Sequence, residues 1–190
     1  GHAQLAAHTA ADLDVASRYL GDNAVTEGYA FVFDNLLRSE RWLRDVLGLA
    51  EPGTFLRFIN FRQLYFLRRY AAKLLYELRL HRTDGEGMAP LYAGTLGESL
   101  GIKVKVENYL ADVDDAFYVA RYLRAWVFEV QLRRVLLDRW GEAWFARPEA
   151  GQFLVGLWRE GQSHTAPELA RRLGYAGLDA EPIIQELMAG

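Results

Sequence analysis

The sequence predicts an all-α protein. Leu, Ala, Arg and Glu, which favour helices, dominate the chain, and apolar side chains recur at helical spacing through most of it. No long stretch alternates apolar and polar residues as a half-buried strand does. We therefore expect more than about two thirds of the residues in helices and no sheet. Since it has no internal repeat and no low-complexity linker, the chain should form one helical domain over residues 1–190.

Three helices are expected in the first half of the chain, over residues 10–20, 24–49 and 55–82. The second and third carry long series of Leu, Phe and Tyr in helical register. Pro52-Gly53 separates these two helices, and the turn-forming sequence at 84–87 ends the third.

A fourth helix is expected over residues 90–100, and a long helix should follow and end at Trp140, before Gly141. Asp112 or Asp114 is the expected N-cap of the long helix, because a short acidic side chain accepts hydrogen bonds from the free amides of a first turn.

The C-terminal section should consist of shorter helices. Thr165-Ala166-Pro167-Glu168 has the form of a capping box with a proline in the first turn, which predicts a helix start. Leu173-Gly174 should end that helix, and a last short helix should begin near Ala180.

The composition excludes several classes of function. The net charge of −3 provides no basic field for nucleic acid or for an anionic membrane surface. Without cysteine the chain has no disulfide, thiol nucleophile or Cys-ligated metal, and this composition fits the cytoplasm. No apolar run approaches the roughly 20 residues of a membrane span, and the first residues lack the pattern of a signal peptide.

The side chains with catalytic potential are one carboxylate and two phenols. Tyr118 and Tyr122 are four residues apart, so on a helix they share one face. Glu27 lies near the start of the second expected helix. A carboxylate on one helix and phenols on another are the groups with which a metal-assisted hydrolase holds its metal and stabilises an oxyanion.

Two parts of the chain resemble the thimet oligopeptidase and oligoendopeptidase F family of zinc peptidases. The N-terminal part resembles the family's helix that bears a glutamate ligand of zinc, through Thr26-Glu27-Gly28-Tyr29-Ala30-Phe31. The C-terminal part resembles the end of the family's catalytic half, through Phe117-Tyr118-Val119 with Tyr122, Gly141-Glu142-Ala143-Trp144, Phe153-Leu154, Gly161-Gln162-Ser163, and Glu168-Leu169 with Leu173-Gly174. The resemblance implies a zincin-like, multi-helix C-terminal domain.

The resemblance also implies roles for single residues. The family binds zinc with an H-E-x-G-H helix and a later glutamate, and Glu27 follows His2 at the family's spacing of 25 residues. His2 and Glu27 would thus be metal ligands. Tyr118 and Tyr122 would lie over the metal, where a tyrosine stabilises the oxyanion. The motif's first histidine and general-base glutamate are missing, as if the chain were cut inside it; alternatively, Gly1-His2 is the remnant of an expression tag.

One departure from the family bears on specificity. The histidine that the family places several residues before the Phe-Tyr pair is absent, because Ala111, Asp112 and Val113 occupy that stretch. Ala116 stands where a proline is common. That histidine helps the family hold its substrate. Its absence therefore leaves open which peptides would be cleaved, and whether the longer parent protein, of which this chain would be a part, is an active peptidase.

The expected function is that of the C-terminal portion of a zinc-dependent oligopeptidase-like protein that hydrolyses peptides. Two zinc ligands without a general base should not hold zinc tightly, so this chain alone should be inactive. Exposed aromatic residues of the second and third helices should drive homodimerisation, the third helix contributing Phe55, Phe58, Phe61, Tyr65 and Phe66. The alternative is a stand-alone helical binding or scaffold domain with an aromatic pocket.

Structural interpretations compete with these roles. In a first helical turn, Glu27 would be favoured by the helix dipole alone, and Tyr118 and Tyr122 are also typical of an amphipathic core. Acidic residues flank three arginine pairs, which should be solvated: Arg68-Arg69, Arg133-Arg134 and Arg171-Arg172. The remaining histidines lack paired ligand spacing and should be surface or cap residues: His8, His81 and His164.

Overall fold

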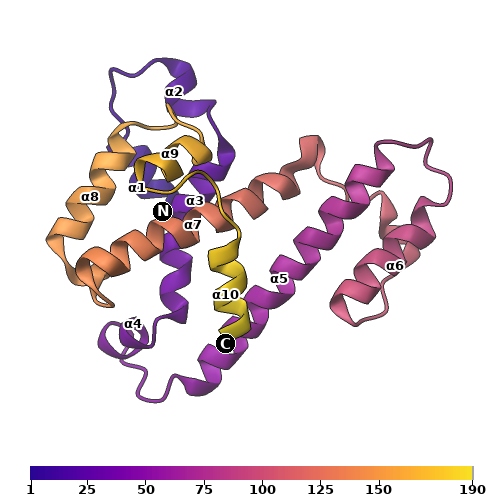
Figure 1. The fold of residues 1–190 in the computed structure, drawn as a ribbon, viewed down its shortest axis with the longest axis horizontal. Helices are drawn as coiled ribbons and strands as arrows, with labels where there is room; N and C mark the ends of the chain where they lie inside the picture. The colour runs from indigo at the N-terminus through magenta and orange to yellow at the C-terminus, as the bar shows by residue number, and fades with distance from the viewer. Residues whose placement is uncertain (190) are drawn as a thin grey trace. The chain divides into compact units, whose positions relative to one another are not determined.

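The computed structural model confirms the all-α prediction (Figure 1). It describes residues 1–189, apart from the side chains of Asp115 and Ala189. Helices of all kinds hold 72% of the chain, and the described residues form no strand. No helix among them is long and apolar enough to cross a membrane.

The α-helices in chain order are α1 (His2–His8), α2 (Val15–Tyr19), α3 (Asn23–Asp34), α4 (Glu40–Asp45), α5 (Gly53–Leu80), α6 (Met88–Leu100), α7 (Tyr118–Trp140), α8 (Pro148–Arg159), α9 (Ala166–Arg172) and α10 (Glu181–Ala189). Short 3₁₀ helices lie between them: η1 (Asn35–Arg38), η2 (Val106–Tyr109), η3 (Asp115–Phe117) and η4 (Trp144–Ala146).

The long periodic segments and the capping box form the helices expected of them. α5 matches the expected residues 55–82 within two residues at each end, and α7 ends at Trp140 as predicted. At the start of α9 both hydrogen bonds of the capping box are present. One of them joins the Thr165 amide to the Glu168 carboxylate at 2.7 Å.

The expected helix over residues 24–49 is wrong, because the chain breaks after Asp34. The 3₁₀ helix η1 follows, and α4 then starts anew. Ser39 caps α4, since its hydroxyl oxygen accepts a hydrogen bond from the Trp42 amide at 3.2 Å. A serine that bonds to the backbone in this way competes with continuation of the preceding helix.

The expected helix over residues 10–20 is reduced to α2. Asp14 caps it, because its carboxylate accepts a hydrogen bond from the Ser17 amide at 2.9 Å. An unpredicted helix, α1, precedes it in the chain.

α7 begins at Tyr118, and the prediction that Asp112 or Asp114 caps it is wrong. Ala116 and Phe117 have φ angles of 51° and 53°, in the left-handed region that residues with a Cβ rarely adopt. The chain therefore enters α7 through a sharp corner, and the two aspartates lie before it.

The chain divides into two compact units. The first combines residues 1–60 with the chain from Arg124 onward, and the second is residues 61–123. α5 and α7 each contribute to both units, because the divisions fall within these helices. One domain over residues 1–190 stays a prediction.

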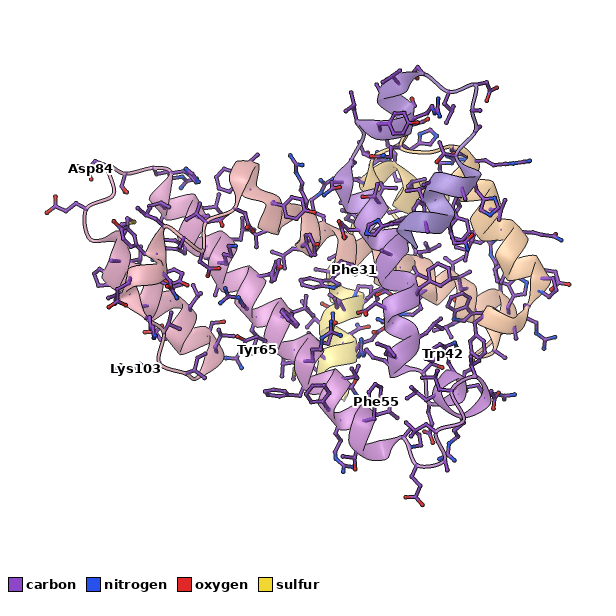
Figure 2. All side chains as sticks on the ribbon, turned by 180° about the vertical axis from the view of Figure 1, so that it is seen from behind. Phe31, Trp42, Phe55, Tyr65, Asp84 and Lys103 are labelled. Carbon is purple, nitrogen blue, oxygen red and sulfur yellow. The ribbon has the colours of Figure 1, made fainter. Side chains whose placement is uncertain are left out.

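The core of the first unit forms around α3, and α1 packs against both α3 and α8. Phe31 of α3, labelled in Figure 2, stacks on Trp126 of α7 with ring centroids 5.3 Å apart. The fully buried members of this core include Val25, Tyr29, Phe128, Leu132 and Leu136.

A glycine within α3 sets its distance from α7. A Cβ on Gly28 would lie 2.5 Å from Cδ1 of Phe128 and 3.3 Å from the carbonyl oxygen of Ala125. The next residue, Tyr29, meets the Phe128 ring edge to face at 5.7 Å. Only glycine at position 28 leaves room for this packing.

The second unit has a small core of its own, where α6 packs beside α5. Tyr76 of α5 and Tyr92 of α6 are buried and meet edge to face, with ring centroids 5.1 Å apart. The Tyr76 hydroxyl donates to the carbonyl of Tyr109 at 2.6 Å, which ties η2 to α5. Ala72, Met88 and Leu96 complete this core.

Replacing Gly28 with alanine should destabilise the protein by about 1–3 kcal/mol, because the added methyl group overpacks the buried Phe128 ring. In an exposed helix the same change stabilises by about 0.5–1 kcal/mol. Gly156 of α8 is exposed and would place a Cβ in open space, so Gly156→Ala is the matched control. Urea denaturation measures both free energies of unfolding. If Gly28→Ala is as stable as the wild type, α3 and α7 do not approach each other closely at this position.

Candidate functional site

α1 brings His2 next to α3 because the two helices approach without a side chain between them. Gly1 is the N-cap of α1, and a Cβ there would lie 2.6 Å from the Ala30 amide nitrogen and 2.7 Å from the Tyr29 carbonyl oxygen. Contacts this short exclude every residue except glycine. Leu5 is buried in the core of the first unit and fixes the rotation of α1.

Glu27 lies in the second turn of α3, which begins at Asn23. Asp22 caps the helix: its carboxylate accepts from the Ala24 amide at 3.0 Å and pairs with Arg124 at 2.7 Å. Glu27 therefore stands beyond the free amides of the first turn, and the interpretation that the helix dipole alone favours it is wrong.

The structure brings His2 and Glu27 together. Nε2 of His2 lies 3.5 Å from Oε2 of Glu27, and the two side chains are 58% and 12% exposed. A hydrogen bond between a nitrogen and an oxygen is about 2.7–3.2 Å long, so this separation is too large for one. The separation lies within ion-pair distance, and the pair carries opposite charges only when the imidazole is protonated.

A cavity of about 510 Å³ opens at this pair. It is lined by His2, Leu5, Ala6 and Thr9 of α1, Arg18 and Tyr19 of α2, Asn23, Thr26 and Glu27 of α3, and Gln162. Three helices and the turn after α8 thus meet around the imidazole and the carboxylate, all within the first unit.

The separation fits two ligands of one metal ion. Zinc binds an imidazole nitrogen at about 2.0–2.1 Å and a carboxylate oxygen at about 2.0–2.2 Å with tetrahedral angles, which places the two ligand atoms roughly 3.4 Å apart. The described residues contain no group of three potential ligands, so His2 and Glu27 form a pair rather than a full set. The other histidines contact single neighbours, His8 with Trp158, His81 with Phe117 and His164 with Glu160.

Tyr118 and Tyr122 share one face of α7, with ring centroids 5.0 Å apart. Tyr70 of α5 contacts Tyr122 at 5.5 Å, and burial, followed by the charge of Asp114, raises the pKa of its hydroxyl. Sequence reasoning missed Tyr70, because no motif surrounds it and its partner is far along the chain. These tyrosines belong to the second unit; that they face the same point as Glu27 stays a prediction.

The segment before Tyr118 is bound to α5 by an ion pair. Arg69 donates two hydrogen bonds, of 2.6 and 2.7 Å, to the carboxylate of Asp112. The Tyr92 hydroxyl donates to the same carboxylate at 2.7 Å. Asp112 therefore anchors this segment to both α5 and α6.

Lys73 and Glu77 hold the residues that follow. The buried Lys73 ammonium lies 2.8 Å from Asp114, and the buried Glu77 carboxylate accepts from the Asp114 amide at 3.1 Å. Oε2 of Glu77 has no hydrogen-bond partner in the described part of the chain, and burial raises the pKa of this carboxyl. These bonds offset the strain at Ala116 and Phe117, which costs about 1–2 kcal/mol per residue.

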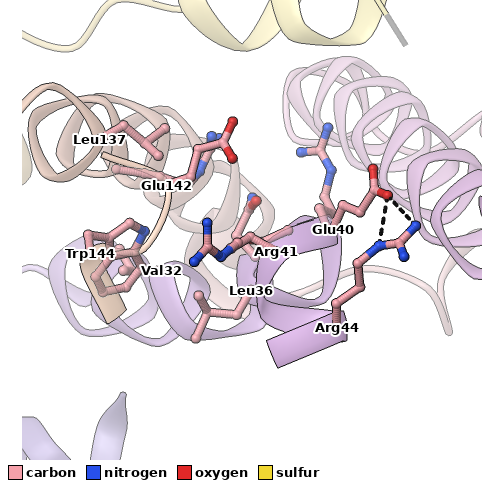
Figure 3. Close-up of a pocket in the computed structure, with 12 residues that line it drawn as sticks. Val32, Leu36, Glu40, Arg41, Arg44, Leu137, Glu142 and Trp144 are labelled. Atoms are coloured by element: carbon pink, nitrogen blue, oxygen red, sulfur yellow. Dashed lines mark hydrogen bonds and ion pairs between the residues drawn. The ribbon is translucent and has the colours of Figure 1, made fainter. Parts of the chain in front are cut away.

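A second cavity, of about 450 Å³, is lined by arginines whose charges are balanced (Figure 3). These arginines are Arg38, Arg41, Arg44 and Arg133. Figure 3 shows two hydrogen bonds from Arg44 to Glu40, and Arg41 pairs with Asp45.

The Arg133 side chain is 13% exposed in this region and pairs with two carboxylates, so the expectation of a solvated Arg133-Arg134 pair is wrong for its first member. It donates at 2.7 Å to Glu129 and at 2.7 Å to Glu186 of α10. Glu129 is 1% exposed, and burial raises its pKa. Arg38 lies 3.8 Å from Glu186. Since each guanidinium has a carboxylate nearby, this second cavity is poorly suited to bind an anion.

Glu77 should make the stability of the protein depend on pH. Its pKa is raised in the folded state, so folding favours the protonated carboxyl, and this contribution is lost as the pH rises from about 4.3, the ordinary value for Glu, through the folded value. Glu77→Gln keeps an oxygen that accepts from the Asp114 amide and removes the charge. We expect this variant to be more stable than the wild type at pH 7 and to lose less stability over that pH range.

Urea denaturation at a series of pH values measures this effect. Glu98→Gln, at an exposed position of α6, is the control and should reproduce the wild-type profile. An unchanged profile in Glu77→Gln would show that the buried carboxyl does not titrate differently in the folded protein.

Comparison of the chain with protein-family models, curated protein sequences and solved structures gives no significant match. The family resemblance therefore rests on the residues that carry it, and the function must be inferred from the geometry of His2, Glu27 and their cavity.

Proposed function

We propose that His2 and Glu27 are two ligands of a zinc ion in the C-terminal part of a peptidase-like metal site. The observation that carries this proposal is the 3.5 Å separation between Nε2 of His2 and Oε2 of Glu27, at a cavity of about 510 Å³. The atoms are too far apart for a hydrogen bond and at the distance of two ligands of one ion. The close contact of Gly1 with α3 supports this geometry through the backbone.

Each group of the chain has a defined task in this proposal. His2 and Glu27 hold the zinc, which in peptidases polarises the peptide carbonyl and activates water. A phenol of Tyr118 or Tyr122 donates a hydrogen bond to the oxygen that becomes negatively charged. The strained residue Ala116 supports a functional position for Tyr118, because such strain gathers at functional sites.

The ligand set of the described residues is too small for catalysis by this chain alone. A catalytic zinc site uses three protein ligands and a base that takes a proton from water. We propose that hydrolysis of peptide substrates belongs to a longer protein in which further residues complete the site. The cysteine-free composition supports the cytoplasm as its compartment.

A stand-alone binding domain is a second candidate, and an aromatic cavity of about 450 Å³ favours it. Its large aromatic side chains are Phe33, Trp42, Trp144, Phe145 and Trp158. A cavity lined by large aromatic and apolar side chains suits a small apolar ligand. His2 and Glu27 have no task in this function, so a zinc titration separates the two candidates.

Zinc should bind His2 and Glu27 weakly, with a dissociation constant above the micromolar range, because two ligands make the site. Nuclear magnetic resonance of the histidine side chains locates the ion: the His2 signals should move first. His2→Ala and Glu27→Ala should each abolish this response. Calorimetric titration should show no submicromolar binding, and a quenched-fluorescent peptide should not be cleaved.

His164 and Glu160 provide the matched control, because they form a second His–Glu pair at 3.2 Å. Arg172 hydrogen-bonds to Glu160, lowers its pKa and competes with a metal ion for its oxygens. His164→Ala should leave the zinc response unchanged. Zinc that moves the His164 signals in place of those of His2 would contradict the proposal. Submicromolar binding, with turnover that Glu27→Ala abolishes, would show a complete site in this chain.

We also propose that a second copy of the chain covers part of α5. Phe58 and Phe61 of this helix are 61% and 65% exposed. The aromatic residues of the second expected helix instead pack against the core of the first unit: Tyr29, Phe31, Phe33 and Trp42. Apolar surface of this kind drives association, and a twofold dimer buries the same surface from both copies.

Phe58→Ser combined with Phe61→Ser should halve the molar mass in solution, because the apolar contact between the copies is lost. Light scattering at micromolar concentration measures the mass of the wild type and of the variant. Leu20 is 74% exposed and lies outside α5, so Leu20→Ser should leave the mass unchanged. A monomeric wild type would remove this proposal.

A further inference from the structure

The cavity at His2 and Glu27 contains a cation that no carboxylate in the described part of the chain neutralises. Arg18 of α2 lines this cavity and forms no ion pair with any residue that the structure describes. Its guanidinium carbon lies 4.9 Å from the ring centroid of its neighbour Tyr19, a contact with the face of the guanidinium that does not use its in-plane N–H donors.

The lack of a carboxylate partner among the described residues distinguishes Arg18 from the arginines of the second cavity. There each guanidinium has a carboxylate partner, as Figure 3 shows for Arg44 and Glu40. An arginine with a partner has little to gain from a further anion, whereas Arg18 can offer its donors to a ligand.

The backbone that carries Arg18 is held in place. Asp14 caps α2, and the amide of Gln162 donates to the Ser17 carbonyl at 2.6 Å. The Gln162 side chain donates to the Arg18 carbonyl at 3.2 Å. Gly161, with φ of +58°, permits this approach, because a Cβ there would lie 2.7 Å from the Ser17 carbonyl oxygen. The guanidinium therefore extends from a fixed point at the turn after α8.

Two hydroxyl groups that line the cavity are engaged within the protein. The Thr9 hydroxyl donates to the Leu5 carbonyl at 2.7 Å, and the Thr26 hydroxyl bonds to Asn23 at 3.0 Å. Arg18 brings a positive charge to this cavity, which the His2–Glu27 pair also lines. The carboxylate of Glu27 and the guanidinium of Arg18 line the same cavity.

We propose that Arg18 binds a carboxylate group of a peptide, either a C-terminal carboxylate or an Asp or Glu side chain, in the cavity at His2 and Glu27. That the ligand is a peptide rests on the proposed function. Guanidinium matches a carboxylate with two parallel hydrogen bonds, which a carboxamide cannot reproduce. A divalent cation held by His2 and Glu27 would offset the charge of Glu27 and leave the cavity positive, which favours an anionic ligand further.

Two pairs of short peptides test this proposal, and nuclear magnetic resonance titration at millimolar concentration measures their binding. The first pair is acetyl-Ala-Ala with a free C-terminal carboxylate and the same peptide as the C-terminal amide. The second is acetyl-Ala-Glu-amide and acetyl-Ala-Gln-amide. In at least one pair the carboxylate form should bind about tenfold more tightly than its neutral partner, and the pair that responds identifies the source of the carboxylate.

Arg18→Gln should remove this preference, and its far-ultraviolet circular dichroism should match that of the wild type, since the guanidinium forms no hydrogen bond or ion pair with the residues that the structure describes. Arg159→Gln changes an exposed arginine of α8 outside the cavity and should keep the preference. No preference in either pair, no binding of any of the four peptides, or a preference that survives Arg18→Gln would overturn the proposal.

Titration with and without zinc separates this inference from the proposed function. If zinc moves the His2 signals and neither peptide pair shows a preference, the metal site stands and the carboxylate site falls. If an Arg18-dependent preference appears and zinc does not bind at His2, the proposed function falls and carboxylate recognition stands.

Discussion

The approach of α3 to its neighbours at two glycines is the constraint on which the candidate site depends. A side chain at position 1 would overlap the backbone of Ala30, so α1 and α3 meet backbone to backbone, and His2 reaches Glu27. Gly28, the residue after Glu27, allows the corresponding contact with α7. Close packing of this kind resists displacement. Helix packing therefore sets how far apart the backbones that carry the imidazole and the carboxylate lie.

Buried charges position segments in both units and add little to stability. Taking an ion out of water costs several kcal/mol before its partner offsets that cost, so a buried ion pair is weak evidence for a stabilising role. Arg133, between Glu129 and Glu186, ties α10 to α7 in the first unit. Lys73 and its neighbours tie the segment around Asp114 to α5 in the second. That segment leads directly into the corner before the candidate tyrosines, so the charges of α5 hold the start of α7.

Sequence reasoning succeeded where a signal is repeated or complete, as in the long period of α5 and the four residues of the capping box. It failed where a single residue decides the outcome. Ser39 ends one helix and starts another inside a pattern that remains apolar at helical spacing. The left-handed corner at Ala116 and Phe117 has no sequence signal, because glycine or asparagine ordinarily marks that conformation. Arg133 looked solvated because its partner Glu186 is distant in the chain.

In the candidate site, too, a residue could be predicted only where a motif surrounds it. Motif spacing predicted His2 and Glu27, which the structure brings within 3.5 Å, whereas Arg18 has no motif around it and reaches the cavity because α2 is bound to the turn after α8. Opposite charges that line one cavity lower their energy by closing into an ion pair. Arg18 forms no ion pair with a residue that the structure describes, although it lines the same cavity as Glu27. A guanidinium without such a partner gains more from an anion out of solvent than a paired one does, and for this reason the carboxylate proposal rests on Arg18 and not on the paired arginines.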